Sequence, residues 1–333
     1  MKAVVLEGER LVKVREVPEP DPDGRALVRV RRAGLCGTDV KIVSGAIPVR
    51  VPLVVGHEMA GTMVAAGSRG LVPEGSRVLI DPGVACGHCG LCRGDRGHLC
   101  RRGALMGRDV DGGFAELVAV DELQLHPIPA AIGDDAAALL QVLGTCVHAQ
   151  TMLDTFPGQS AVVVGLGVTG LLHLQLLRAR GVDIVVGVTR SAAKRALATR
   201  LGASAVAAPE QAADVVGEVT GGHGPDLVVE AAGTGATLAQ AIELAGFGAT
   251  VLVFGIVTAA ERLPTYQLYY KELTVLNPRA ARPRDYARAI QLAAAGALRL
   301  EPLLTATFPL EEAVNALDAC RDPSQLKVAL DVA

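Results

Sequence analysis

Four cysteines separated by glycines form the most distinctive cluster in the sequence. Cys86, Cys89, Cys92 and Cys100 follow the spacing C-x2-C-x2-C-x7-C. A tetrahedral Zn²⁺ ion needs four thiolates that converge on one point, and glycines allow the tight turns that this requires. Iron–sulfur clusters use similar spacings, and reactive or unpaired cysteines are a third interpretation. The pattern favours a closed zinc site, which stabilises a lobe and performs no chemistry.

A second set of metal-binding residue types lies earlier in the chain. Cys36 stands in the segment GLCGTD, and His57 and Glu58 follow in the segment GHE. One thiolate, one imidazole and one carboxylate suit a catalytic zinc, which keeps a coordination position open for substrate. Each residue alone would more often be ordinary structure. Their combination with the cysteine lobe and with a glycine-rich loop makes the interpretation specific.

The glycine-rich loop predicts a dinucleotide site. It consists of Gly165, Leu166, Gly167, Val168, Thr169 and Gly170. The apolar run Ala161 to Val164 precedes it and a helical pattern, Leu171 to Arg180, follows, which is the context that gives a G-x-G-x-x-G motif its meaning. The glycines permit a tight turn, and the helix N-terminus stabilises a pyrophosphate. A plain glycine-rich turn is the alternative.

The end of the next predicted strand bears on the choice of coenzyme. The strand Ile184 to Val188 is followed by Thr189 and Arg190, with Lys194 one turn later. An NAD-preferring protein commonly carries an acid there for the ribose hydroxyls, whereas a 2′-phosphate prefers Arg and hydroxyl donors. No acid is present, so we expect NADP(H) to be preferred over NAD(H). Arg190 as a solvated residue at a helix start is the alternative.

Composition and charge restrict the classes of partner. Lys and Arg total 32 against 35 Asp and Glu, and the net charge of -3 gives no footprint for nucleic acid. Aromatic residues make up 3% of the chain and Trp is absent, which disfavours a pocket built from stacked rings. Small aliphatic or polyol molecules are therefore the expected substrates.

The sequence also predicts a cytoplasmic protein. The first residues lack a cleavable signal pattern, and the uncharged stretch 244–260 is interrupted by glycines, so we expect no membrane span. The chain has 7 cysteines, an odd number, four of them in the lobe, which favours metal binding over disulfides. A homo-oligomer, either a dimer or a tetramer, is expected.

The pattern of apolar runs and turns along the sequence changes near residue 130. Before it, short apolar runs such as Ala26 to Val30 and Val78 to Ile80 alternate with Gly, Pro and Asp turns, which is typical of a β-barrel. After it, strands alternate with helices, which predicts a parallel sheet. Strands are expected at 161–164, 184–188, 227–229 and 251–254, helices at 283–295 and 310–321, and a last strand at 328–332.

With 333 residues the chain should form more than one domain. We expect a catalytic domain at residues 1–145 with the metal lobe at 86–100, and a dinucleotide-binding domain at 146–282. A C-terminal segment, 283–333, is expected to return to the catalytic domain.

These motifs together resemble the zinc-containing medium-chain alcohol dehydrogenases, nearest the sorbitol, threonine and glucose dehydrogenase branch. The resemblance covers essentially the whole chain and includes the segment GGFAE at 112–116. It implies an α/β protein with a GroES-like β-barrel catalytic domain and a Rossmann, doubly wound parallel-sheet coenzyme domain. It also implies two Zn²⁺ ions per chain and hydride transfer between a secondary alcohol or polyol and NAD(P).

The same resemblance implies roles for individual residues. Cys36 and His57 would be ligands of the catalytic zinc, with Glu58 as a ligand or exchanging partner, and the Thr38 hydroxyl would take the proton of the alcohol. A bound zinc would lower the pKa of that alcohol. Many relatives place a His three residues after this hydroxyl, where the present chain has Lys41, so the outward proton path departs from the family pattern.

The remaining ligand of the catalytic zinc is predicted to be Gln141, bound directly or through a water. The polyol branch commonly has a Glu about two dozen residues before the dinucleotide loop, where this chain has Gln141. Cys146 is the competitor and would give the ligand set of the ethanol-oxidising branch. Five residues turn a helix through roughly 500° and advance it by about 7.5 Å, so the two side chains cannot share a ligand position.

Two other functions share parts of this pattern. A zinc-free quinone or enoyl reductase of the same superfamily has the same fold, but ordinarily lacks the Cys36, His57 and lobe-cysteine set. A non-catalytic nucleotide-binding scaffold with structural zinc would predict degraded residues at the open site. Cys36, Thr38, His57 and Glu58 are all present, which favours the dehydrogenase.

Overall fold

The computed structural model describes residues 1–257 and 262–332, which form two compact units. The first unit comprises residues 1–144, 280–296 and the chain from 300 onward, and the second comprises 145–279 and 297–299. In the part of the chain that the structure describes, no helix is long and apolar enough to cross a membrane.

The first unit is built around a mostly antiparallel barrel sheet with the order β10-β6-β5-β3-β18-β17, in which β9 also pairs with β3. The strands are β3 (Ala26–Leu35), β5 (Glu58–Ala65), β6 (Arg77–Ile80), β9 (Leu117–Val120), β10 (Leu125–Pro127), β17 (Leu304–Pro309) and β18 (Lys327–Asp331). One pair of neighbours, β17 and β18, is parallel. Along β3 buried and exposed residues alternate, as expected for a strand with one face on a core.

Shorter elements complete this unit. A second sheet has the order β2-β1-β4, and β7 pairs with β8. These strands are β1 (Lys2–Gly8), β2 (Leu11–Glu16), β4 (Leu53–Val54), β7 (Gly83–Val84) and β8 (Ala104–Leu105). The helices are α1 (Gly37–Val43), α2 (Gly90–Arg93), α3 (Asp134–Ala137), α10 (Pro283–Ala294) and α11 (Ala313–Ala319), with 3₁₀ turns at 97–99, 122–124, 301–303 and 310–312.

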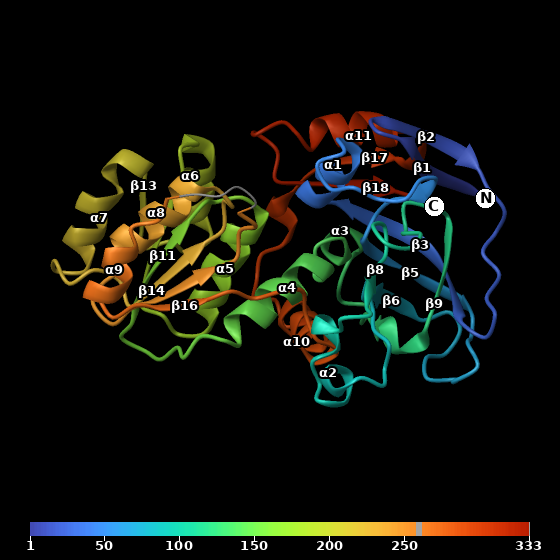
Figure 1. Cartoon of the computed structure of the whole chain (residues 1–333), viewed down its shortest axis with the longest axis horizontal. Helices are drawn as coiled ribbons and strands as arrows, with labels where there is room; N and C mark the ends of the chain where they lie inside the picture. Colours follow the sequence, from blue (N-terminus) through green and yellow to red (C-terminus); the bar gives the residue numbers. More distant parts are fainter. Residues whose placement is uncertain (258–261, 333) are drawn as a thin grey trace. The chain divides into compact units, whose positions relative to one another are not determined.

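The core of the first unit joins residues from both ends of the sequence. Val28 and Met63 from the barrel are fully buried with Phe114, and Ala316 and Leu330 from the C-terminal segment belong to the same cluster. Burial of each large apolar side chain contributes about 1.5–3 kcal/mol. The helix α11 packs on β17 and β18 (Figure 1), so the C-terminal segment is part of the core of the first unit.

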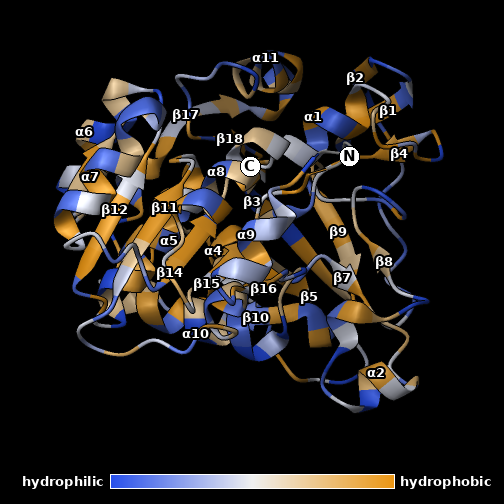
Figure 2. Ribbon diagram, turned by 60° about the vertical axis from the view of Figure 1, so that its left-hand side comes forward, coloured by the Kyte–Doolittle hydropathy of each residue, from blue (hydrophilic) through white to orange (hydrophobic). Residues whose placement is uncertain are grey.

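The second unit is a six-stranded sheet with the order β13-β12-β11-β14-β15-β16, in which every pairing is parallel. Its strands are β11 (Ser160–Val164), β12 (Ile184–Val188), β13 (Ala205–Ala207), β14 (Leu227–Glu230), β15 (Thr250–Val253) and β16 (Thr274–Leu276). The central strands are continuous apolar runs (Figure 2), because helices cover both faces of a sheet of this kind.

Helices connect consecutive strands of this sheet (Figure 1). They are α5 (Val168–Ala179), α6 (Ala192–Arg200), α7 (Ala212–Val219), α8 (Gly235–Leu244) and α9 (Thr265–Tyr270), with a 3₁₀ turn at 209–211. The helix α4 (Leu140–Gln150) begins in the first unit and ends in the second.

The predicted fold class is confirmed. The β-rich part is followed by alternating strands and helices, and the final strand belongs to the first unit. The expected helix at 310–321 is a 3₁₀ turn followed by α11, which ends at Ala319. The last residues of the uncharged stretch 244–260 lie outside the described residues.

Candidate active site and metal sites

The four lobe cysteines converge on one point. Their sulfur atoms all lie within 4.8 Å of one another. The Sγ atoms of Cys89 and Cys92 are 3.4 Å apart, those of Cys86 and Cys92 3.8 Å, and those of Cys89 and Cys100 3.9 Å. Four thiolates around a tetrahedral zinc at about 2.3 Å would have sulfur–sulfur distances of about 3.8 Å. The observed spacing therefore fits a closed zinc site.

Local backbone geometry holds these sulfurs together. Gly87 has φ +75, which a residue with a Cβ adopts only with strain, and Cys89 begins the short helix α2 as its N-cap. A hydrogen bond from the backbone of His88 is the main cause that lowers the pKa of the Cys86 thiol to about 5. Nη2 of Arg102 lies 3.6 Å from the same sulfur. Backbone donors and a cation of this kind stabilise a thiolate.

Cys36, His57 and Glu58 also come together, with ligand atoms within 4.8 Å of one another. Cys36 follows the end of β3 and is the N-cap of α1, while His57 and Glu58 stand at the start of β5. The antiparallel register of β3 and β5 pairs Gly34 with Glu58, which brings the two chain segments side by side. A glycine at 34 is required, because a Cβ there would lie 2.6 Å from Glu58 Oε2.

Asp39 fixes the orientation of two of these ligands. Its Oδ1 lies 3.1 Å from His57 Nδ1, and its Oδ2 accepts a hydrogen bond of 2.8 Å from the backbone N–H of Cys36. Asp39 is fully buried. With Nδ1 occupied, Nε2 is the imidazole nitrogen that can face a metal, an arrangement common at zinc-binding histidines. Burial opposes a charge on His57, but Asp39 and then Cys36 outweigh it and raise the pKa of the imidazole.

Glu58 is held by a buried lysine from the C-terminal segment. Lys327 Nζ lies 2.6 Å from Glu58 Oε2 and donates a hydrogen bond of 3.0 Å to the carbonyl of Leu35. Both side chains are almost completely buried. Burial opposes the lysine charge, yet Glu58 and Cys36 raise the pKa of Lys327. The ion pair compensates the buried charge of the Glu58 carboxylate.

The two candidates for a further ligand lie in different surroundings. Gln141 is buried in the first turn of α4, and its Nε2 donates a hydrogen bond of 3.3 Å to the hydroxyl of Tyr286. Cys146 is fully buried in the second unit, with its sulfur 4.0 Å from the carbonyl oxygen of Thr169. Among the described residues it belongs neither to the lobe cysteines nor to the group of Cys36, His57 and Glu58. Thr38 and Lys41 lie on α1, directly after Cys36, and both are partly exposed.

The glycine-rich loop connects β11 to α5, and two of its glycines are required by close backbone approach. Gly165 has φ +95, and a Cβ on Gly170 would lie 1.8 Å from the carbonyl oxygen of Gly165. Gly167 is the N-cap of α5 and Val168 its first residue, so the first N–H groups of the helix face outward from the loop. This is the geometry of a site for an anionic group.

The tip of β12 carries hydroxyl and basic groups. Ser191 caps α6 by accepting a hydrogen bond from Lys194 N at 3.3 Å. Arg195 Nη1 donates to the carbonyls of Thr189 at 2.7 Å and Arg190 at 2.9 Å, which fixes the backbone of the tip. The side chain of Arg190 is exposed. A fixed backbone with an exposed guanidinium suits recognition of a phosphate.

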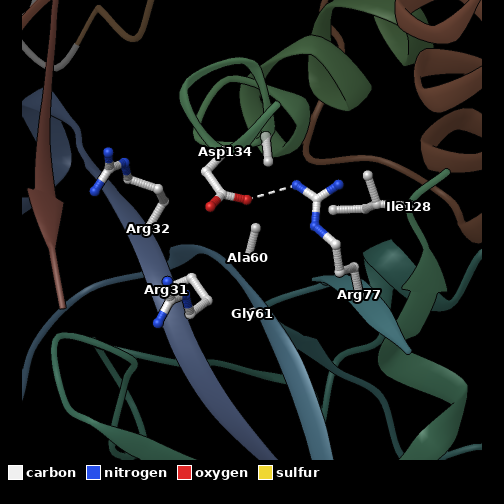
Figure 3. Close-up of a pocket in the computed structure, with 8 residues that line it drawn as sticks. Arg31, Arg32, Ala60, Gly61, Arg77, Ile128 and Asp134 are labelled. Atoms are coloured by element: carbon white, nitrogen blue, oxygen red, sulfur yellow. Dashed lines mark hydrogen bonds and ion pairs between the residues drawn. The ribbon is translucent and has the colours of Figure 1, made fainter. Parts of the chain in front are cut away.

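A small pocket elsewhere in the first unit is lined by several charged residues (Figure 3). Two of its three arginines are paired with aspartates. Arg77 Nη2 lies 2.6 Å from Asp134 Oδ1, and Arg32 is paired with both Asp135 and Asp331. This pocket is therefore a set of structural ion pairs, separate from the groups that could bind metal.

Comparison with known proteins identifies the family. The model described as Alcohol dehydrogenase GroES-like domain matches residues 22–130, and the model described as Zinc-binding dehydrogenase matches residues 168–295. L-galactonate-5-dehydrogenase of Escherichia coli (strain K12) is 30% identical over 306 residues, covering 90% of this chain and 89% of that protein. The chain belongs to the zinc-containing medium-chain alcohol dehydrogenases.

Two solved structures agree with this assignment. A zinc-binding dehydrogenase from Sinorhizobium meliloti 1021, bound to NADP, has a TM-score of 0.92 and 34% identity, covering 99% of both chains. Alcohol dehydrogenase TADH from Thermus sp. ATN1 has a TM-score of 0.93 and 31% identity, covering 100% of both. As a member of this family, the chain is an NAD(P)-dependent oxidoreductase that acts on alcohols.

The sequence did not indicate a role for three residues near the group of Cys36, His57 and Glu58. Asp39 could have been found from its place in the GLCGTD segment, two residues before Lys41 on the same turn. Lys327 and Tyr286 carry no motif, since they lie far along the chain in elements that only the fold brings to Glu58 and Gln141.

Proposed function

We propose that this chain interconverts a secondary alcohol or polyol and its ketone, at a zinc held by Cys36, His57 and one or both of Glu58 and Gln141. The convergence of a thiolate, an imidazole and a carboxylate within 4.8 Å, with His57 oriented by Asp39, is the observation that supports it most. This donor set fits Zn²⁺. When bound, the metal supplies Lewis acidity that lowers the pKa of the alcohol. The alternative, a zinc-free quinone or enoyl reductase, gives these residues no role.

The proton of the alcohol is proposed to leave through Thr38. Its hydroxyl is two residues from Cys36 in the first turn of α1 and partly exposed, so it can both accept from a substrate hydroxyl and donate outward. Lys41, one turn later on the same helix, is the next polar group along that surface. A hydroxyl relay of this kind needs an oxygen and does not depend on the threonine methyl.

For the coenzyme we propose NADP(H) as the preferred form, with NAD(H) as the alternative. Gly165, Gly167, Val168 and Gly170 would bind the pyrophosphate at the start of α5. The exposed guanidinium of Arg190, with Thr189 and Lys194 beside it, supports binding of a 2′-phosphate. The first unit would then act as the catalytic domain and the second unit as the coenzyme domain.

A second zinc is proposed for the lobe of Cys86, Cys89, Cys92 and Cys100, where it would have a structural role because all four positions are taken by thiolates. Four clustered thiolates must stay reduced to bind it, which supports a cytoplasmic location. The whole chain would thus bind two zinc ions.

Self-association is proposed as well, to a dimer or a tetramer. Large aromatic side chains gather at the surface of the second unit: Tyr266, Tyr269 and Tyr270 on α9 are exposed, and Phe247 packs against Tyr270 with ring centroids 5.4 Å apart. The neighbouring β16 is an edge strand of the sheet. Exposed apolar patches of this kind mark interaction surfaces. Analytical ultracentrifugation of the wild type and of Tyr269→Glu tests this proposal. It would be excluded if both proteins sediment as monomers.

The zinc proposal is tested by elemental analysis of metal-replete protein together with two variants. Cys89→Ser should lose one zinc and thermal stability, whereas His57→Ala should lose the other zinc and turnover while the lobe stays loaded. A panel of secondary alcohols, sugars and inositol-like polyols, followed by the absorbance of reduced nicotinamide, then defines the substrate. Wild-type protein that contains no zinc would exclude this function.

A further inference from the structure

We propose that Tyr286 is a positioning residue that turns the side-chain amide of Gln141 so that its oxygen, and not its nitrogen, faces the catalytic metal site. The inference rests on the proposed function, and it concerns one hydrogen bond within the first unit. Tyr286 lies on α10, in the C-terminal segment, and Gln141 lies in the first turn of α4.

The amide of Gln141 has one oxygen and one nitrogen, so its orientation decides whether it can bind a cation. Its Nε2 donates a hydrogen bond of 3.3 Å to the hydroxyl oxygen of Tyr286. Within the described residues, no side-chain or backbone donor is paired with its Oε1. A metal ligand must present a lone pair, and only the oxygen of a side-chain amide does so. The hydrogen bond therefore leaves the useful atom free.

Asp81 is the acidic group that bears on the direction of this hydrogen bond. Its charge raises the pKa of Tyr286, after the larger effect of burial, and the phenol in turn affects Asp81, so the two groups are neighbours. A phenol has a single hydrogen. When Asp81 is ionised it can only accept, so it takes the hydrogen of the phenol, and the phenol oxygen is then free to accept from the NH₂ of Gln141.

Gln141 stands close to the open metal site. A Cβ built on Gly34 would meet both Oε2 of Glu58, at 2.6 Å, and the carbonyl oxygen of Ala138, at 3.0 Å. Ala138, three residues before Gln141, is the C-cap of α3, so the chain that leads into α4 lies against β3 at the position beside Glu58. The charge of Glu58 also contributes to the raised pKa of Tyr286, after the larger effects of burial and of Asp81. The tyrosine, the amide and the carboxylate therefore share one buried region.

The ring of Tyr286 has little freedom to move. The side chain is 1% exposed, and its ring centroid is 5.2 Å from that of His126. On the other side the ring occupies the space of a missing side chain, since a Cβ on Gly144 would lie 2.2 Å from Tyr286 Cδ1. Gly144 is three residues after Gln141 on the same helix. The helix thus accommodates the ring one turn away from the amide that the ring's hydroxyl orients.

This arrangement also fits the departure from the polyol branch, where a Glu commonly stands at this position. A carboxylate has two equivalent oxygens and can ligate in either orientation, whereas an amide turned the wrong way presents only N–H groups. A glutamine at this position therefore needs an acceptor such as Tyr286 for its nitrogen, and a glutamate does not.

The test is a double-mutant cycle on zinc affinity, with the lobe site kept loaded. Zinc is removed from the open site with a chelator, and Zn²⁺ is titrated back in competition with a chromophoric chelator. Tyr286→Phe, which removes only the hydroxyl, should weaken binding about 10- to 100-fold, as is usual when the partner of a metal ligand is lost. In the Gln141→Glu background the same change should cost about threefold or less, because a carboxylate has no N–H to orient.

A spectroscopic readout separates positioning from packing. With Co²⁺ in place of zinc, Tyr286→Phe should alter the visible absorption of the open site in the wild-type background, where residue 141 is glutamine. In the Gln141→Glu background, adding Tyr286→Phe should leave the spectrum unchanged. Thr307→Val, which removes an exposed hydroxyl from β17 of the same unit, is the control and should change neither measurement. If Tyr286→Phe is poorly folded, Asp81→Leu leaves the ring in place, removes the acceptor beside the phenol and should weaken zinc binding in the same direction.

The outcomes are distinguishable. Equal losses of affinity from Tyr286→Phe in the wild-type and Gln141→Glu backgrounds, or no loss in either, would reject the positioning role. Wild-type protein that takes up zinc in the lobe but none at the open site would reject the proposed function itself, before any variant is compared.

Discussion

Gly144 is a helix position where two opposing effects of one methyl group can be compared. The residue lies in α4, and glycine within a helix is less favourable than alanine by about 1 kcal/mol. On helix propensity alone, Gly144→Ala would therefore be stabilising. The added Cβ would, however, lie 2.2 Å from Cδ1 and 2.5 Å from Cε1 of Tyr286, which is fully buried.

The steric effect should win. Overpacking a well-packed interior costs about 1–3 kcal/mol, and a contact with the edge of a confined ring belongs at the upper end of that range. After the gain in helix propensity, we expect Gly144→Ala to lower the free energy of unfolding by about 2 kcal/mol. The displaced ring should also weaken zinc binding at the open site.

Chemical denaturation of the zinc-loaded protein measures this change. Gly217 supplies the matched control, because it lies within α7 and a Cβ there would meet nothing within 4 Å. Gly217→Ala should accordingly stabilise by about 0.5–1 kcal/mol. Stabilisation by Gly144→Ala to the same extent would refute the packing argument. So would an unchanged effect of Gly144→Ala in a Tyr286→Leu background, where the clashing ring is gone.

Three further predictions concern the coenzyme, the proton path and pH. Arg190→Ala should lower kcat/KM with NADP about ten- to a hundredfold, the equivalent of about 1.5–3 kcal/mol for a charge-assisted contact, and leave NAD kinetics unchanged. A wild-type preference for NAD would contradict it. Thr38→Ala should slow hydride transfer strongly and Thr38→Ser only modestly, as measured in single turnovers, and equal losses would argue against the relay. Burial raises the pKa of Asp81 from 3.8 to about 7, so its protonated form is favoured in the folded state. The free energy of unfolding should thus fall as pH rises from about 4 to about 7, by at most about 1.4 kcal/mol per pH unit from this group. Asp81→Asn should flatten that dependence, and an identical slope in both proteins would show that Asp81 is not its source.

Much of the fold could be predicted because it depends on local signals. The run Ala161 to Val164 and the glycines after it indicate a strand, a turn and a helix without reference to the rest of the chain, and β11 and α5 are found there. The barrel strands were predicted less completely, because their pairing joins distant segments. The neighbour of β3 on one side is β18, about three hundred residues later, and only the apolar pattern of the tail indicated that it returns.

The sequence predicted the possible metal ligands of the candidate site, but not the residues that orient them. Cys36, His57 and the lobe cysteines are chemically unusual and closely spaced, so the sequence indicated groups that the structure places within ligand distance of one another. The residues that orient them are ordinary in type. Lys327 and Tyr286 become informative only when burial and distance are known, because a lysine or a tyrosine is usually a surface or core residue without a partner of this kind.

The place of β18 has a consequence for the order in which the protein forms during synthesis. The segment 145–279 is nearly the whole of the second unit, so this unit can fold as soon as its own residues have left the ribosome. The barrel sheet cannot, since residues 32–35 of β3 must wait for residues 327–331 before their edge is paired, and Glu58 must wait for Lys327 before its buried charge is neutralised. For most of its synthesis the N-terminal part therefore exposes a partly unpaired strand and a partly formed core. That period is when the nascent chain would depend most on protection by a chaperone.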